Sequence, residues 1–261
     1  MRRQNLLQVR LVSVEASKTE CCPELLGNHA ALLCLLPHQR SYLHKALALV
    51  GTGTRVVKAS AAEVYAQSVC SRVAELDNGL LSLRLVQRFA GALANDSDPD
   101  PDIYRYQYEN FVFRCIGHVD RAHLLVAAAL LMSKKRGKMP DNHLIEGQVK
   151  NRNAGVHAAL LEVKSTVQFY RRPRNELVHA SAYSCRDFGV LGGVLYLDLN
   201  VEGVDIEAVA RALFSEGSNE IATTLEVLTL KLGALLEALR PMFELVAKAA
   251  TKKAASKEAV E

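Results

Sequence analysis

The chain has 261 residues, of which 49% are apolar and 23% are charged, so it can form a sizeable core and is not a disordered protein. Its net charge of +4 is too small to identify a nucleic-acid-binding protein by itself. Tryptophan is absent and aromatic residues make up only 6%. Together with alanine- and leucine-rich stretches, this composition favours helix-on-helix packing over a β-sandwich.

The sequence indicates a cytoplasmic protein without a membrane segment. The longest apolar run, residues 122–132, is well short of the ~20 residues that a membrane-spanning helix needs. Arg10 interrupts the apolar stretch behind Met1-Arg2-Arg3, so a secretion signal is not expected. The cysteines are too sparse for a disulfide scaffold, and with the nearby histidines they match no paired zinc-binding spacing. We expect free thiols, no metal and no cofactor.

The first 95 residues are predicted to form a strand followed by helices. We assign this region to no known fold or function. Residues 6–14 alternate apolar and polar side chains, as a half-buried strand does. Residues 60–94 show helical spacing of apolar side chains, and Ser60 with Glu63 matches a capping box at the start. The acidic, proline-rich residues 95–102 then form a solvated connector.

The remainder of the chain is predicted to be mainly helical, with one β element. The glycine-containing apolar run 190–199 favours a hairpin, or a strand that pairs with 6–14. Pro173 should kink or restart a helix, and Pro241 should bend one. The expected helices are 104–135, 142–170, 205–214 and 220–248. The predicted organisation is an N-terminal region (1–95), a helical-bundle domain (101–250) and a frayed, basic, low-complexity tail (251–261).

Positive charge is concentrated in one stretch. From Lys134 to Arg174 there are ten basic and three acidic residues, a net +7 in a chain whose total is +4. A stripe of this kind suits a polyanion, although a solvated helix face has the same composition. The candidate RNA-binding residues in it are Arg152, Lys164, Arg171 and Arg172.

Within this stripe, three residues separate the pair Arg174-Asn175 from His179. With 19 arginines, 8 histidines and 11 asparagines, about 0.025 such matches are expected by chance. A second match runs from Arg152-Asn153 to His157, with Gly155 inside it. We favour the match that ends at His179 because it follows Pro173 near the end of a helical run and lies beside further arginines.

The Arg174–His179 segment resembles the Arg-polar-x(3–5)-His signature of HEPN-domain proteins, and the resemblance extends over about residues 101–250. This family consists of helical-bundle dimers and includes many metal-independent ribonucleases. The resemblance implies a homodimer whose cleft is built from two facing copies of the motif. It also implies a prokaryotic toxin or phage-defence role, with an antitoxin or regulatory protein as a partner.

The residue types in the motif fit RNA cleavage by internal attack of the 2′-hydroxyl. Histidine can transfer protons near neutral pH, which suits His179 to general acid/base catalysis. Arg174 offers a permanently charged fork for phosphate oxygens, and Asn175 could orient the histidine or bind the phosphate. At ~100° per residue, Arg171, Asn175 and His179 form one stripe, whereas Arg174 and His179 lie about 140° apart. Glu176 is expected to pair with Arg172.

Two other interpretations stay open. His118 and Arg121 are neighbours on a helix and either face the same cleft or form a buried, satisfied pair. The rival to a nuclease is a non-catalytic helical module that binds RNA, nucleotide or a protein partner, because composition by itself indicates only a helical bundle with a basic face.

Overall fold

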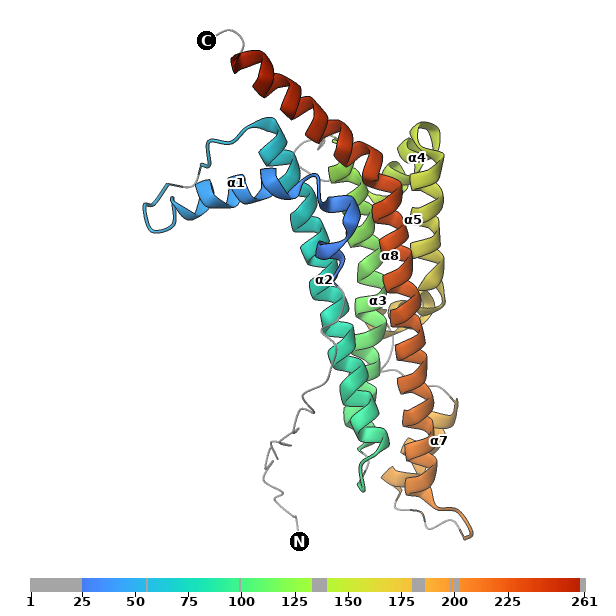
Figure 1. The fold of residues 1–261 in the computed structure, drawn as a ribbon. Helices are drawn as coiled ribbons and strands as arrows, with labels where there is room; N and C mark the ends of the chain where they lie inside the picture. Colours follow the sequence, from blue (N-terminus) through green and yellow to red (C-terminus); the bar gives the residue numbers. More distant parts are fainter. Residues whose placement is uncertain are drawn as a thin grey trace.

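The computed structural model describes residues 25–54, 56–98, 100–132, 140–179, 186–197, 199 and 202–258 (Figure 1). These residues form eight α-helices and three short 3-10 helices, and no strand lies among them, so the prediction of a mainly α fold is confirmed. The elements are η1 (Leu26–Asn28), η2 (Ala30–Leu32), α1 (Leu36–Leu47), α2 (Ala61–Ala94), α3 (Pro101–Ala129), α4 (Asn142–Arg152), α5 (Ala154–Thr166), η3 (Gln168–Tyr170), α6 (Arg171–His179), α7 (Arg186–Tyr196) and α8 (Ile206–Glu258).

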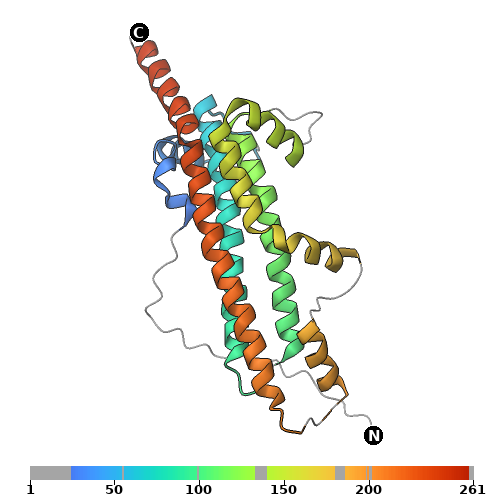
Figure 2. The same ribbon diagram turned by 90° about the vertical axis from the view of Figure 1, so that its right-hand side faces the viewer.

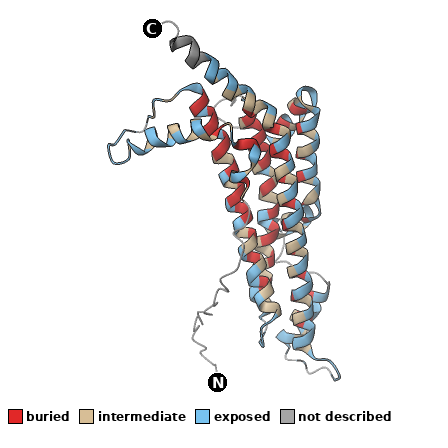
Figure 3. Ribbon diagram, in the orientation of Figure 1, coloured by how far each residue is buried: buried red, intermediate tan, exposed pale blue. Residues whose placement is uncertain are grey.

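The long helices α2, α3 and α8 form the body of the bundle, and α5 packs along α8 and α3 (Figures 1 and 2). Buried residues line the inner faces of these helices in one continuous core, whereas α1 is largely exposed (Figure 3). This core includes α2, which belongs to the stretch 1–95 that resembles no known family. The described part of that stretch therefore shares its hydrophobic core with the predicted helical domain.

The predicted capping box at the start of α2 is confirmed. The Glu63 N–H donates to Ser60 Oγ at 3.3 Å, and the Glu63 carboxylate accepts the Ser60 N–H at 2.7 Å. Lys45 and Ser41 of α1 donate to the same carboxylate. Hydrogen bonds from Lys45, Ser41 and the Ser60 backbone hold the pKa of Glu63 at about 2. The Glu63 carboxylate therefore caps the N-terminus of α2 and also bonds α1 to α2.

The predicted helix over 142–170 is divided into α4 and α5. The break is at Asn153, which has φ −152° and ψ 89°, and its Oδ1 accepts the N–H of Val156 at 3.0 Å to cap α5. After α5, η3 leads the chain into α6, and Pro173 lies in the first turn of α6. Of the two expected effects of Pro173, a kink or a restart, the structure therefore has the restart.

The predicted β element over 190–199 is wrong, because α7 extends from Arg186 to Tyr196. Phe188 and Leu191 are buried one helical turn apart, and the Phe188 ring lies 5.9 Å from the ring of Tyr104 on α3. Burial of this face favours a helix despite the two internal glycines, whose helix propensity is low. Its expected partner, 6–14, lies outside the described residues.

The two helices expected over 205–214 and 220–248 are one continuous helix, α8. It passes through Pro241 and continues to Glu258, so residues 251–258 of the predicted tail are helical. The C-terminal part of α8 leans away from the bundle (Figure 1). Pro241 removes one backbone N–H there, which permits a bend without ending the helix.

A close contact between α2 and α3 supplies a stability prediction. A Cβ on Gly79 would lie 2.6 Å from Nε2 of His118, a ring that is fully buried and bonded through Nδ1 to the Arg114 carbonyl at 2.8 Å. Gly79→Ala is expected to lower the free energy of unfolding by about 1–3 kcal/mol, measured by urea unfolding, because the ring cannot withdraw. In a His118→Ala background the same change should be neutral or stabilising; an equal loss in both backgrounds would contradict this cause.

Candidate functional site

The helix that carries the favoured motif, α6, is held at its base by a buried tyrosine. The hydroxyl of Tyr170 lies 2.7 Å from Oε1 of Glu220 and 2.9 Å from Oγ1 of Thr224, both on α8. Its ring meets the edge of Phe111 on α3 at 4.9 Å between centroids. Leu177 packs against the core, and the rest of α6 projects from the α3 side of the bundle, away from α8 (Figure 2). The motif is therefore presented on a fixed but accessible helix.

A shallow depression of about 530 Å³ lies on α6. Its walls include Arg171, Asn175 and His179, the three residues predicted to share one stripe. The other lining residues are Gln168, Arg172 and Glu176. Arg171, Asn175 and His179 are all exposed, so solvent and a large ligand can reach them. Gln168 was not among our candidate site residues. Its position three residues before Arg171 could have indicated that the two side chains lie on the same face.

The expected pairing of Arg172 with Glu176 is confirmed at 2.9 Å between Nε and Oε1. The Arg172 side chain is 89% exposed, so this ion pair can be exchanged for another anion at little cost. Glu176 therefore neutralises one of the two arginines that line the depression. Within the described residues, Arg171 forms no ion pair with a carboxylate.

Arg174 is placed differently from the other motif residues. It does not line the depression, and its Nη1 donates to Asn175 Oδ1 at 3.2 Å. This agrees with the angle of about 140° expected between Arg174 and His179 on a helix. In a single chain, Arg171 therefore shares the helix face of His179, whereas Arg174 is connected to this face only by its hydrogen bond to Asn175.

The second sequence match is divided by a helix boundary. Arg152 ends α4 and is exposed, Asn153 caps α5, and His157 lies half-buried in the first turn of α5. The side-chain oxygen of Asn153 is occupied by the Val156 N–H. A capping role therefore accounts for this asparagine without any ligand.

Lys164 belongs to a buried charged network and not to the depression. Its Nζ lies 2.8 Å from Oε1 of Glu146, and the same oxygen lies 2.9 Å from Nε2 of His123. Nδ1 of His123 lies 2.7 Å from the Val119 carbonyl, so both ring nitrogens of this buried side chain have hydrogen-bond partners. Burial raises the pKa of Glu146, but the hydrogen bonds from Lys164 and His123 outweigh it and hold this pKa below its ordinary value. The network joins α3, α4 and α5.

His118 and Arg121 do not form a cleft. His118 is fully buried, and burial lowers its pKa. Its Nδ1 must donate to the Arg114 carbonyl, while Nε2 has no hydrogen-bond partner among the described residues. No bond joins it to the half-buried Arg121 in that part of the chain. His118 is therefore a buried side chain and does not line a cleft.

Of the predicted basic stripe, Lys134, Lys135, Arg136 and Lys138 lie outside the described residues. Among the described residues, no group of three or more His, Cys, Asp or Glu side chains could hold a metal ion. None of the described helices combines the length and apolarity needed to cross a membrane. Comparisons with protein-family models, curated proteins and solved structures found no match.

Proposed function

We propose that this protein is a metal-independent endoribonuclease of the HEPN type, and that α6 is the helix that contacts RNA. The observation that carries the proposal is the exposed depression in which two arginines, Asn175 and His179 come together. A toxin or phage-defence role, with an antitoxin or regulatory protein as a partner, would follow from the same resemblance.

The roles follow from the position of each side chain. Arg171 binds a phosphate oxygen, and Arg172 joins it when the phosphate displaces Glu176. His179 takes the 2′-hydroxyl proton or returns one to the leaving 5′-oxygen, which needs no metal. Asn175 donates to the phosphate through its amide while its oxygen accepts from Arg174, which links Arg174 to the site as a positioning residue.

The test is incubation of the purified full chain with labelled single-stranded RNA in the presence of EDTA. The expected products carry 2′,3′-cyclic phosphate and 5′-hydroxyl ends. Arg171→Gln with Arg172→Gln should weaken RNA binding and lower the slope of log K against log salt by about 2, since each phosphate contact contributes about one. Lys248→Gln, at an exposed position on α8, is the matched control. Salt-sensitive binding without cleavage would overturn the nuclease and leave the RNA-binding module.

A further inference from the structure

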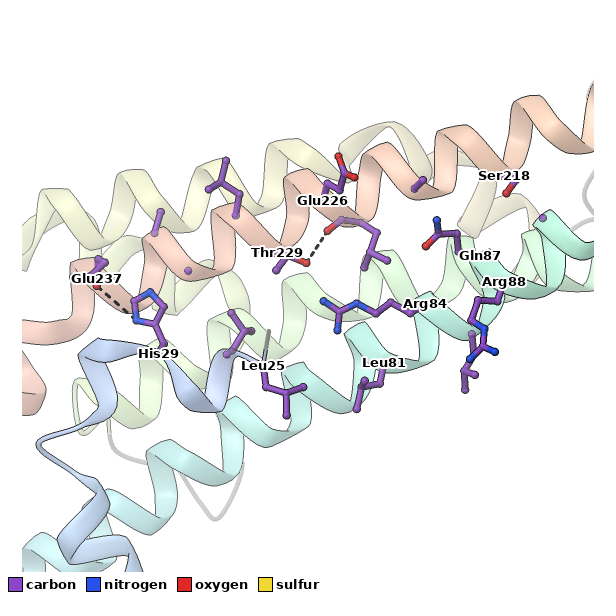
Figure 4. A pocket seen from close by; sticks show the side chains of 18 residues that line it. Leu25, His29, Leu81, Arg84, Gln87, Arg88, Ser218, Glu226, Thr229 and Glu237 are labelled. Atoms are coloured by element: carbon purple, nitrogen blue, oxygen red, sulfur yellow. Dashed lines mark hydrogen bonds and ion pairs between the residues drawn. The ribbon is translucent and has the colours of Figure 1, made fainter. Parts of the chain in front are cut away.

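A groove of about 1420 Å³ lies between α2 and α8, on the side of the bundle away from α6 (Figures 2 and 4). Its edge is apolar and exposed: Leu81 and Leu85 on α2 are 37% and 50% exposed, and Leu230 on α8 is 70% exposed. On α8 the floor is made of small residues, Ser218, Ala222, Gly233 and Ala234. Small residues beside exposed leucines permit the close approach of another helix.

The groove also contains an arginine whose hydrogen bonding is incomplete. Arg84 points from α2 toward the part of α8 that carries Glu226 and Thr229 (Figure 4). Its Nη1 is buried and has no hydrogen-bond partner among the described residues. Glu226 is exposed and forms no ion pair in the described part of the chain, so it does not satisfy Arg84 from within the same chain. Arg84 as a whole is only partly buried and forms no ion pair among the described residues, so its charge is available to a carboxylate from outside the chain.

The register of α2 against α8 places Arg84 and Glu226 at the same height along the axis of the bundle. Ser218 Oγ lies 3.2 Å from where a Cβ on Gly91 would be, which aligns these two positions. Because α2 and α8 run in opposite directions, seven residues back along α2 (91 − 7 = 84) correspond to seven residues forward along α8 (218 + 7 = 225). Arg84 is therefore level with Leu225 and its neighbour Glu226. By the same counting, Leu81 is within one turn of the level of Leu230.

We propose that a second copy of this chain docks on this groove, with a two-fold axis parallel to the bundle, so that α2 of each subunit faces α8 of its partner. A rotation about such an axis keeps the level of every residue. Arg84 then meets the partner's Glu226, and Leu81 meets the partner's Leu230, and each contact occurs twice. The partner's carboxylate then neutralises the Arg84 charge, which no described carboxylate of its own chain pairs with.

Charge favours a second copy over other occupants. The groove contains cationic Arg84 and acidic Glu226 at its middle, so it is complementary to itself and not to a purely anionic ligand. The alternative two-fold arrangement places α2 opposite the partner's α2 and α8 opposite its α8, so Arg84 does not face the partner's Glu226. Since α6 projects on the other side of the bundle, the dimer leaves both α6 depressions open to RNA (Figure 2). The inference does not depend on the proposed nuclease.

The test is sedimentation velocity of the full chain over a concentration series. The wild type should be dimeric, and Arg84→Glu or Glu226→Arg should each weaken dimerisation by about 100-fold or more, because each places like charges together twice. An equimolar mixture of the two variants should dimerise again, since the mixed dimer has an opposite-charge pair at both positions. Restoration by mixing cannot come from a change within one chain.

Controls separate this surface from others. Leu85→Glu should also give monomers, whereas Leu245→Glu, at an even more exposed leucine on α8 outside the groove, should not. Circular dichroism should show the same helix content in every variant. A monomeric wild type would overturn the proposal. So would a dimer that the groove variants leave intact, or variants whose mixture stays monomeric.

Discussion

Replacing His179 by alanine is expected to lower the rate of RNA cleavage by about 10²–10⁴-fold, the usual contribution of a general acid/base. RNA affinity should hardly change, because the depression keeps Arg171 and Arg172, whose charges dominate phosphate binding. His179 ends α6 and is exposed, so its removal opens no cavity in the core. The measurement is single-turnover cleavage of a labelled RNA alongside a binding titration.

Two further variants show whether a loss of cleavage is specific to His179. His143→Ala removes an exposed histidine of α4 outside the depression and should leave cleavage unchanged. His157→Ala tests the second Arg-Asn match. Full activity in His179→Ala together with loss in His157→Ala would assign the reaction to that match. Equal activity in all four proteins, wild type included, would reject a catalytic histidine in either motif.

Replacing Glu146 by alanine is expected to lower the free energy of unfolding by about 1–3 kcal/mol, because it leaves the buried Nε2 of His123 without its hydrogen-bond partner. The His123 side chain is fully buried, whereas Lys164 is partly exposed, so most of the loss should come from the histidine. Glu162→Ala is the matched control: it removes an exposed acid that pairs with Lys231 at 2.9 Å and should cost less than about 1 kcal/mol.

The effect of Glu146 should depend on pH in a defined direction. Its pKa is lower in the folded state, so its stabilisation is complete above the ordinary carboxyl pKa near 4.5 and is lost as the pH falls through the lowered value. Urea unfolding at pH 7 and at about pH 3 should therefore show a smaller difference between wild type and Glu146→Ala at the acidic pH. A difference that stays constant, or one no larger than that for Glu162→Ala, would contradict the network's role.

The α6 depression and the α2–α8 groove lie on different sides of the bundle, and we propose different roles for them. Tyr170 and the bundle hold α6 in place on one side, and the α2–α8 groove lies on the other. In the proposed dimer each subunit would present its own RNA-contacting helix, whereas the HEPN resemblance implies one cleft shared by two motifs. Cleavage that persists in the monomeric Arg84→Glu variant would favour separate sites.

Local spacing was enough to predict the features that depend only on neighbours along a helix. The capping box of Ser60 and Glu63, the helical stripe of Arg171, Asn175 and His179, and the Arg172–Glu176 pair all involve residues three to eight positions apart. Helical geometry brings such residues together whatever surrounds them. The mainly α fold follows in the same way, because the apolar period of a long helix marks the face that will be buried.

What the sequence could not determine is which distant segments cover each face. Residues 190–196 have the glycines and apolar run of a hairpin, yet burial of Phe188 beside Tyr104 makes them helical. Lys164 has the charge of an RNA ligand, but it forms an ion pair with Glu146, eighteen residues away, and does not line the depression on α6. The groove needs Arg84 and Glu226 at one level, a register that only the antiparallel packing of α2 on α8 sets. Spacing along the chain decides which side chains share a face, and tertiary packing decides what that face meets.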